Sequence, residues 1–302
     1  MALITVFTPL YNRLNTLCRT YDSLRKQTCF DFEWLIIDDG STDDPYDTIW
    51  QWIKEEENFA IRYIHKENGG MHTAHNVAYK NIHTELNVCI DSDDYMPKNA
   101  IQLIVDCWKS CKDSGFAGII ALDFADSTKR VIGKDLPSNK DSITLSGYYE
   151  NGGLGDKKLI YRTDIIRETP PYPVFDGEKY VSLAYKYHLI DEKYELKILN
   201  ECVCIVDYQL DGSTNNMYRQ YLNNPRGFAF WRKEQMRHSK TMKQQFKACV
   251  HYVSSSMISK NKKYVKESPL KAMTVFATPF GIALYWFILF KSKKSNMRIN
   301  GK

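Results

Sequence analysis

The feature that most constrains the fold of this chain is an alternation of short apolar runs with helix-like segments. Strand-length apolar runs occur five times in the first 122 residues, and between them apolar side chains recur at helical spacing. Strands that alternate with helices in this way predict an α/β fold, with a mostly parallel sheet and helices on both faces. The runs lie at residues 3–7, 32–37, 60–64, 86–90 and 117–122.

Three of these runs stop at segments rich in polar or acidic residues. Residues 8–11 follow the first run, Asp38-Asp39 the second and Asp91-Ser92-Asp93-Asp94 the fourth. In open parallel sheets, ligands bind beyond the carboxyl ends of the strands. We therefore expect the three segments to meet at one edge of the sheet and to form a binding site.

The segment Asp91-Ser92-Asp93-Asp94 places three carboxylates within four residues. Such groups repel one another unless they are solvated or neutralised by a cation. Hard cations such as Mg²⁺ and Mn²⁺ take oxygen ligands and often bridge one or two carboxylates to a diphosphate. An acidic surface turn is the simpler interpretation, but the position directly after a buried strand favours a metal site.

A second acidic segment, Asp38-Asp39-Gly40-Ser41-Thr42-Asp43, follows the second run. One interpretation is structural, because a hydroxyl or carboxylate here is suited to cap a helix that starts near Pro45. The other is that one carboxylate accepts hydrogen bonds from a nucleoside base or ribose. The two interpretations are compatible, because the closely spaced acids exceed what one helix cap requires.

Four short segments stand in register along the chain: Thr8-Pro9-Leu10-Tyr11-Asn12-Arg13, Asp38-Asp39-Gly40-Ser41-Thr42-Asp43, Glu67-Asn68-Gly69-Gly70 leading to Asn76, and Asp91-Ser92-Asp93-Asp94. Their order and spacing resemble those of family 2 glycosyltransferases, closely over the first 120 residues and more loosely to about residue 215. The resemblance implies the GT-A fold, which is Rossmann-like. It also implies inverting transfer of a sugar from a nucleotide diphosphate, most commonly a UDP-sugar.

The resemblance further implies a role for each matching position. Tyr11 would lie against the base with Thr8 beside it, and Asp39 would accept a hydrogen bond from the base. Asp93 would bind a divalent metal, Mn²⁺ or Mg²⁺, and Asp91 would assist the metal or hold the ribose. The expected nucleotide-sugar-binding residues are together Thr8, Pro9, Tyr11, Arg13, Asp38, Asp39, Asn68, Gly69, Gly70, His75, Asp91 and Ser92.

Two histidines, His72 and His75, lie three residues apart on the helix expected after Gly69-Gly70. Such a pair suits a metal ion, but contacts to the nucleotide or within the protein are the favoured interpretation. The resemblance implies that His75 stands where the family often has Arg.

Inverting transfer also needs a base that takes the proton from the acceptor hydroxyl. The resemblance implies that this base belongs to a Glu-Asp pair at a helix start, well after the metal segment. Glu178 occupies that place, and Asp176 is the second candidate. Lys179 departs from the pattern, because it stands where the Asp often stands. The alternative is a plain acidic helix N-terminus.

A polar segment at residues 208–215 resembles the family's loop that closes over the diphosphate. Ser213, Thr214 or the nearby Arg219 would contact phosphate there. A simple turn is the alternative.

The last part of the chain is strongly basic. Residues 219–302 carry 18 of the 41 Lys and Arg residues but only two acidic residues, Glu234 and Glu267. This asymmetry predicts a polyanionic partner, either a membrane surface or a nucleic acid. We therefore divide the chain into a catalytic domain at 1–218 and a basic helical C-terminal region at 219–302.

Residues 272–290 form an uncharged stretch close to the minimum length that spans a bilayer. Pro279 and Gly281 interrupt it, and lysines flank both ends. We expect a peripheral anchor on the inner face of the cell membrane, in preference to a crossing helix or a buried core helix, and no nucleic-acid partner. This location suits a saccharide or lipid-linked acceptor and the synthesis of capsule, exopolysaccharide or another cell-surface glycan.

The eight cysteines are scattered, with no C-x-x-C pair and no zinc-site spacing. The chain enters a strand-like run by Leu3, so we expect no signal peptide and a cytoplasmic protein with reduced thiols.

Two other functions fit parts of this pattern. A nucleotidyltransferase also uses acidic clusters and Mg²⁺, but it would carry a glycine-rich phosphate loop after the first strand, and Thr8-Pro9-Leu10-Tyr11 has no glycine. A membrane-tethered nucleotide-sugar-binding protein with a degenerate site is the alternative without an activity, and Lys179 leaves it open. A metal-dependent glycosyltransferase is the main prediction.

Overall fold

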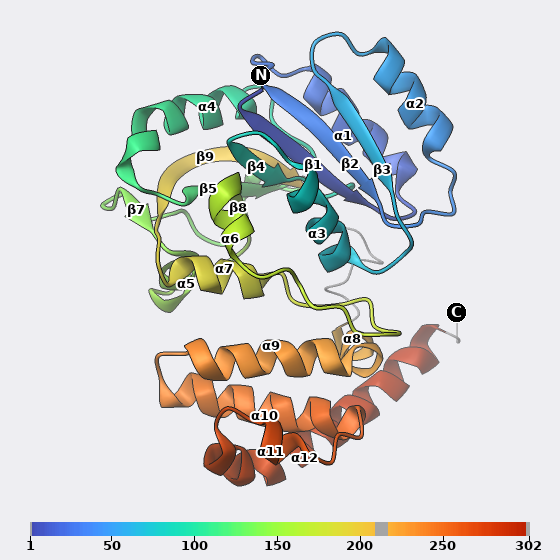
Figure 1. Cartoon of the computed structure of the whole chain (residues 1–302), viewed down its shortest axis with the longest axis vertical. Helices are drawn as coiled ribbons and strands as arrows, with labels where there is room; N and C mark the ends of the chain where they lie inside the picture. The colour runs from blue at the N-terminus through green and yellow to red at the C-terminus, as the bar shows by residue number, and fades with distance from the viewer. Residues whose placement is uncertain (1, 209–216, 300–302) are drawn as a thin grey trace. The chain divides into compact units, whose positions relative to one another are not determined.

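The computed structural model describes residues 2–208 and 217–299 and divides the chain into two compact units (Figure 1). The first unit comprises Met1–Pro171 and Lys186–Gln209, and the second comprises Tyr172–Tyr185 and Leu210–Lys302. We expected one boundary after residue 218, whereas this division falls after Gln209. Tyr172–Tyr185 joins the second unit because its aromatic rings pack there: the ring centroids of Tyr180 and Phe228 are 4.7 Å apart.

The first four strands form the parallel part of the sheet in the first unit. Their spatial order is β3-β2-β1-β4, and every pairing among them is parallel. The intervening helices take the chain back across the sheet, as parallel pairing requires. The strands are β1 (Ile4–Leu10), β2 (Phe32–Asp38), β3 (Ile61–His65) and β4 (Leu86–Cys89), which confirms the first four expected strands.

The expected α/β sheet is parallel from β3 to β4 and becomes mixed beyond β4. The strand next to β4 is β8, which runs antiparallel to both β4 and β5. The order continues β8-β5-β9-β7, with β9 parallel to β5, β7 antiparallel to β9 and β6 paired to β5. These strands are β5 (Gly118–Ala125), β6 (Arg130–Val131), β7 (Ser142–Ile143), β8 (Lys157–Arg162) and β9 (Leu196–Val206).

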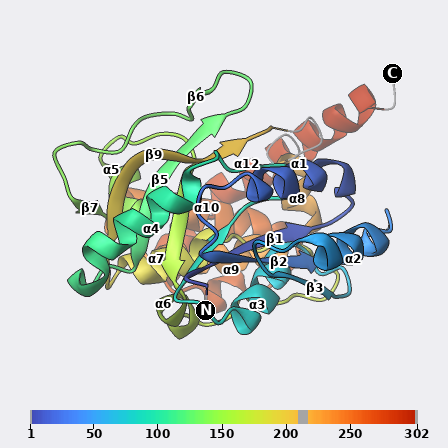
Figure 2. The ribbon, with the colours of Figure 1, turned by 90° about the horizontal axis from the view of Figure 1, so that it is seen from above.

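Helices cover both faces of this sheet because successive side chains of a strand point to opposite faces. Ile4 and Val6 of β1 belong to a core that includes Leu17 of α1 and residues of α2 and α4. Phe7 points the other way and packs edge-on against His75 and Tyr79 of α3. Figure 2 shows α1 and α3 on opposite sides of β1 and β2. The helices are α1 (Leu14–Arg25), α2 (Tyr46–Glu55), α3 (Met71–Asn81) and α4 (Ala100–Cys111).

Four shorter helices lie between α4 and β9 in the chain. The 3-10 helix η1 follows α4 directly, and α6 follows β8 directly. The helix α7 begins at Ala184, so the helix expected to start at Glu178 begins six residues later. These elements are η1 (Lys112–Ser114), α5 (Leu145–Glu150), α6 (Thr163–Glu168) and α7 (Ala184–Asp191).

The second unit is helical, and α10 lies between α9 and α12. Its core contains Met236 of α9, Tyr252 of α10 and Ala277 of α12. The apolar stretch expected at 272–290 is helical, and α12 is long and apolar enough over Lys271–Ser292 to cross a membrane by length and composition. The helices are α8 (Met217–Asn223), α9 (Pro225–His238), α10 (Met242–Ile258), α11 (Tyr264–Glu267) and α12 (Lys271–Ile299).

The junction of β5 and β8 depends on a glycine. At Gly118 φ is +149°, and a Cβ there would lie 1.9 Å from the carbonyl oxygen of Ile160 on β8. We expect Gly118→Ala to lower the free energy of unfolding by about 3 kcal/mol, the upper end of the usual range for single substitutions. Urea denaturation measures this change.

Gly115 provides the matched control, because its φ is +77° but a Cβ there would meet nothing within 4 Å. Gly115→Ala should cost about 1–2 kcal/mol from backbone strain alone. Equal losses for the two variants would contradict the proposed clash with β8.

Candidate active site at the carboxyl edge of the sheet

The carboxyl ends of β1, β2, β3 and β4 lie side by side, as the polar segments after these strands predict. Leu10 is paired with Asp38, and Asp38 with His65. The contacts continue past the strand ends, because the Asp39 N–H donates to the Leu10 carbonyl and the Ile90 N–H donates to the Phe7 carbonyl. The loops that follow the four strands therefore share one edge.

Asp38 is buried and holds the edge together. One carboxylate oxygen accepts from the Ser41 N–H at 2.9 Å; the other accepts from the Tyr63 hydroxyl at 2.6 Å and lies 2.9 Å from His65 Nδ1. Burial alone would raise the pKa of Asp38, but these hydrogen bonds together lower it below the usual value. In this structure the carboxylate binds protein groups.

Asp39 fixes the turn that begins α3. Its two oxygens accept from the N–H groups of Gly69 at 2.9 Å and Gly70 at 2.7 Å, and the Lys66 ammonium also contacts it. A Cβ at Gly40, where φ is +76°, would lie 2.8 Å from the Asn68 nitrogen, so the loops after β2 and β3 touch. The expected nucleotide residues Asp39, Asn68, Gly69 and Gly70 are thus brought together.

The loop after β1 presents an aromatic ring. Tyr11 is 48% exposed just beyond the strand, whereas Thr8 and Pro9 are buried within it. Thr8 accepts a hydrogen bond from the Trp34 indole at 3.0 Å. The loop is tied to its neighbour, because Asn12 Oδ1 accepts from the Thr42 N–H at 2.6 Å. The loop that carries Tyr11 is therefore held in place by the loop after β2.

Asp91, Ser92, Asp93 and Asp94 form the loop after β4. Asp91 and Asp93 are part-exposed, whereas Ser92 and Asp94 are buried. Burial and the repulsion from Asp91 raise the pKa of Asp93, while burial raises that of Asp94 to about 7. Asp94 accepts the N–H of Asp207 at the end of β9 at 3.1 Å. Its role is therefore to hold the loop against β9.

Asp91 and Asp93 are the part-exposed carboxylates of this loop, and both were predicted to bind a cation. Within residues 2–208 and 217–299, no cluster of three or more His, Cys, Asp or Glu side chains is arranged to hold a metal ion. Two carboxylates suit a hard divalent ion that takes further ligands from phosphate and water. Burial and, after it, repulsion from Asp91 raise the pKa of Asp93, and such an ion would relieve the repulsion.

Residues of α1 that sequence reasoning missed support this loop. Arg19 Nη2 donates to the carbonyl of Asp93 at 2.6 Å and to the carboxylate of Asp207 at 2.8 Å. The Thr20 hydroxyl donates to the carbonyl of Asp94 at 2.7 Å. Residues 14–25 read as an ordinary amphipathic helix, and no signal in them indicates this contact with a loop some 70 residues later.

Lys158 and Asp123 are a second missed feature. Asp123 is buried, the Lys158 side chain is 12% exposed, and Lys158 Nζ lies 3.8 Å from Asp123 Oδ1. Burial works against the charge of Lys158, but nearby carboxylates, Asp123 first among them, raise its pKa well above the usual value. Asp91 and Asp94 also act on it. A buried cation thus offsets part of the negative charge at the end of β4.

Comparison with known proteins now gives the family. The sequence profile described as Glycosyl transferase family 2 matches residues 5–169, more than half of the chain. The chain belongs to glycosyltransferase family 2. Its fold is the GT-A fold, since solved glycosyltransferases superpose on nearly the whole chain.

Three similar proteins illustrate the match. A chondroitin synthase of Pasteurella multocida is 35% identical over 101 residues, which are 33% of this chain and 10% of that protein. S. aureus TarS 1–349, solved with UDP-GlcNAc, aligns over 98% of this chain and 92% of its own at a TM-score of 0.60 and 14% identity. The mannosyltransferase PcManGT from Pyrobaculum calidifontis was solved with GDP-Man and Mn²⁺. It aligns over 96% of this chain and 83% of its own, at a TM-score of 0.55 and 15% identity.

The curated relatives and the solved structures match this chain over different lengths and support different conclusions. The chain spans 10% to 16% of the length of the first curated relatives that it matches. The two solved structures share the fold, at an identity too low to carry more than that.

The two candidates for the family's base lie in the second unit. Glu178 is buried, and its Oε1 accepts from both the backbone N–H and Nε of Arg226, at 3.0 and 2.9 Å. Its Oε2 accepts from the Gly227 N–H at 2.8 Å. Glu178 therefore caps the N-terminus of α9. Asp176 has an exposed side chain. Which residue is the base stays a prediction.

His75 is 1% exposed and lies in the core against Phe7 and Tyr79. Burial lowers the pKa of His75 to about 3 and that of His72 to about 4. Both rings are therefore neutral at pH 7, so His75 does not provide the positive charge of the Arg often found at this position of the family.

Two parts of the sequence prediction lie elsewhere. Ser213 and Thr214 lie outside the described residues, and Arg219 lies in α8 of the second unit.

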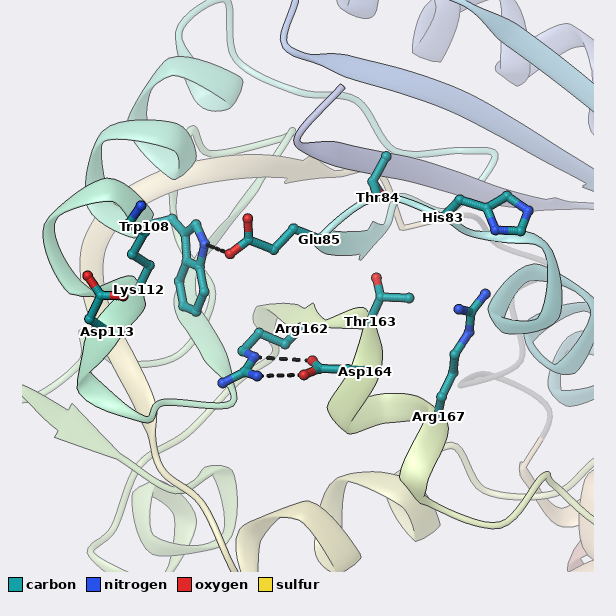
Figure 3. Close-up of a pocket in the computed structure, with 10 residues that line it drawn as sticks. All are labelled: His83, Thr84, Glu85, Trp108, Lys112, Asp113, Arg162, Thr163, Asp164 and Arg167. Carbon is teal, nitrogen blue, oxygen red and sulfur yellow. Dashed lines mark hydrogen bonds and ion pairs between the residues drawn. The ribbon is translucent and has the colours of Figure 1, made fainter. Parts of the chain in front are cut away.

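A cavity of about 640 Å³ opens at the opposite edge of the sheet, beside the start of β4 and the end of β8 (Figure 3). Its polar groups already contact one another: Arg162 pairs with Asp164, and Glu85 accepts from the Trp108 indole.

The pair of Lys158 and Asp123 yields a test. Lys158→Met leaves Asp123 buried without its cation, so the free energy of unfolding should fall by about 3–5 kcal/mol. The double variant Lys158→Met/Asp123→Asn removes the charge of both partners and should recover part of that loss. A double-mutant cycle by urea denaturation measures the coupling, and strictly additive losses would rule the ion pair out.

The capping of α9 by Glu178 gives a second testable prediction. Glu178→Ala removes the acceptor of three hydrogen bonds, so the free energy of unfolding should fall by about 1–3 kcal/mol. The exposed Asp176 serves as the control, and Asp176→Ala should change stability by less than about 0.5 kcal/mol. If Asp176→Ala destabilised the protein as much as Glu178→Ala, the capping role would be wrong.

Proposed function

We propose that this protein is an inverting glycosyltransferase that moves a sugar from a UDP-sugar to a saccharide acceptor with the help of a divalent metal. The observation that carries the proposal is the meeting of four polar loops at the carboxyl edge of β1 to β4, with Asp91 and Asp93 at its end. Membership of family 2 supports sugar transfer. A UDP-GlcNAc complex of TarS and the chondroitin synthase relative support a UDP-sugar and a role in polysaccharide synthesis.

The donor would bind across the loops after β1, β2 and β3. Tyr11 offers an exposed ring on a fixed support for stacking on the base. Asp39 has used three of its roughly four acceptor positions on Gly69, Gly70 and Lys66, which leaves one for a donor group of the base. The N-terminus of α3 follows Gly70 and presents backbone N–H groups.

Asp93, assisted by Asp91, would hold the metal, which when bound acts as a Lewis acid on the departing diphosphate. The Mn²⁺ in the PcManGT structure supports a divalent ion. The residues of this chain do the positioning: Arg19 and Thr20 fix the carbonyls of Asp93 and Asp94.

For proton removal from the acceptor, we favour Asp176 over Glu178. A base must have a free oxygen within reach of the hydroxyl. Both oxygens of Glu178 already accept hydrogen bonds from α9, whereas the Asp176 side chain is exposed. In the proposed reaction the acceptor oxygen bonds to the anomeric carbon, the bond to the diphosphate breaks, and the carboxylate receives the proton.

We further propose that the enzyme acts on the cytoplasmic face of the cell membrane on a saccharide or lipid-linked acceptor. All eight cysteines are free, which suits a reducing compartment. The basic C-terminal region would bring the site to an acceptor at the membrane.

Sugar transfer from a panel of labelled UDP-sugars into membrane extract tests the proposal. Asp93→Asn should lower the rate about 100-fold or more, because a neutral amide is a weak ligand for a hard cation. EDTA should abolish transfer, and Mn²⁺ should restore it. Asp106→Asn, an exposed carboxylate on α4, is the control and should leave the rate unchanged.

Nucleotide-dependent thermal stabilisation separates the alternatives. UDP with Mn²⁺ should raise the unfolding temperature of the unaltered protein more than that of Asp93→Asn. Transfer that is unaffected by EDTA and by Asp93→Asn would refute the metal role. Stabilisation without any transfer would favour a binding protein.

A further inference from the structure

Most buried positions of α12 carry small side chains, and most of its large apolar side chains are exposed. A helix of a water-soluble bundle shows the opposite distribution. The positions that face α10 are small or short, including Thr274, Ala277 and Gly281, which are buried. Most of its large apolar side chains are exposed instead. We call these the α12 outer face: Phe276, Phe280, Ile282, Trp286, Phe287 and Phe290, with exposed fractions from 38% to 77%. Ile288 is buried, and the rings of Phe280 and Phe287 also contact Phe246 of α10 and Tyr218 of α8.

The inward side of α12 packs closely on α10. A Cβ at Gly281 would lie 2.4 Å from the Cβ of Val253, so the two backbones approach each other through the glycine. Thr274 lies against Ser268, with 2.6 Å between the hydroxyl oxygens. Small residues at a helix contact are typical of helices whose other side meets lipid, whereas a soluble helix turns its large apolar residues inward.

Exposed lysines lie near both ends of α12 in the chain. Lys262, Lys263, Lys266 and Lys271 are exposed near the start of the helix, and Lys291 is exposed near its end. From residue 258 to the end of the chain, Glu267 is the one acidic residue in the sequence. A wide apolar surface with cations near both ends of its helix matches the chemistry of an anionic lipid bilayer, which offers hydrocarbon below a layer of negative headgroups.

The packing of α12 also distinguishes a helix that lies on the bilayer from one that crosses it. A crossing α12 would take α10 into the hydrocarbon with it, and α10 carries the exposed Lys243 and Lys247. To cross alone, α12 would have to leave the core that it shares with Met236 and Tyr252. Both alternatives expose polar groups to hydrocarbon or apolar groups to water.

We infer that the α12 outer face docks on an anionic lipid bilayer, with α12 in the plane of the interface and α10 on its water side. This inference rests on the membrane location proposed above but not on sugar transfer. Vesicle binding without donor or acceptor therefore tests it separately from the enzymatic activity.

Flotation of the full chain with vesicles is the first test. The protein should float with phosphatidylcholine vesicles that contain phosphatidylglycerol, and high salt should weaken binding. Phe276→Ser/Phe280→Ser should lower binding at least about tenfold, because two large apolar side chains no longer enter the interface. The control is Tyr46→Ser/Trp50→Ser, an exposed aromatic pair four residues apart on α2, which should bind normally.

The lysines near the start of α12 have their own matched pair. Lys262→Gln/Lys263→Gln should lower binding to the phosphatidylglycerol vesicles about tenfold and have little effect on pure phosphatidylcholine. Lys26→Gln/Lys54→Gln, two exposed lysines of the first unit, should have no effect. Equal loss in the two lysine variants would overturn the charge match at α12.

Two outcomes would overturn the inference in other ways. Retention in the membrane pellet after alkaline carbonate extraction would indicate a crossing helix, whereas an in-plane helix is extracted. Light scattering without lipid tests whether a second copy of the chain covers the α12 outer face. If Phe276→Ser/Phe280→Ser turned a dimer into a monomer and left vesicle binding unchanged, the face would be a dimer interface.

Unaltered unfolding temperatures of the variants would show that these exposed substitutions leave the fold intact.

Discussion

Parallel hydrogen bonding between β1, β2, β3 and β4 is the constraint on which the rest of the first unit depends. Parallel strands all point the same way, so the polar loops that follow them meet at one edge. Asp38 and Asp39 then convert this meeting of loops into a fixed arrangement. Asp38 binds Ser41 of its own loop and Tyr63 of β3, whereas Asp39 binds Gly69 and Gly70 of the neighbouring loop. The position of the proposed donor site is thus determined by the pairing of the strands and not by any single loop.

Concentrating carboxylates at such an edge is unfavourable unless their charge is offset. The structure offsets it without a metal in two ways. Lys158 brings a buried positive charge from the antiparallel strand β8, and Arg19 reaches from α1 to Asp207 and to the loop carbonyl of Asp93. The remaining repulsion between Asp91 and Asp93 is local, and the proposed cation would relieve it.

Much of this arrangement could be predicted from the sequence, because periodicity and strand-end motifs are local signals. The first four strands, α1 to α4 and the convergence of Asp38-Asp39 with Asp91–Asp94 came from such signals. The place of β8 between β4 and β5 did not, because the residues 157–162 contain no information about their pairing partners. The capping role of Glu178 also escaped, since its partner Arg226 lies 48 residues later and only folding brings the two together.

The same limit applies to single side chains. His75 was expected at the nucleotide, and the helical pattern around it places it correctly on α3. Which face of α3 meets Phe7 is decided by packing, and that packing puts the ring in the core.

The contact of Gly40 with Asn68 has a consequence for how this chain tolerates length changes. The loops after β1, β2 and β3 are bound to one another through Asn12 and Thr42, through Gly40 and Asn68, and through Asp39 and Gly69. An insertion in any one of them would displace the other two, so deletions and insertions are costly there. We therefore expect these three loops to keep their length, and natural variation in chain length, with any new contacts to sugars that it brings, to accumulate elsewhere in the chain.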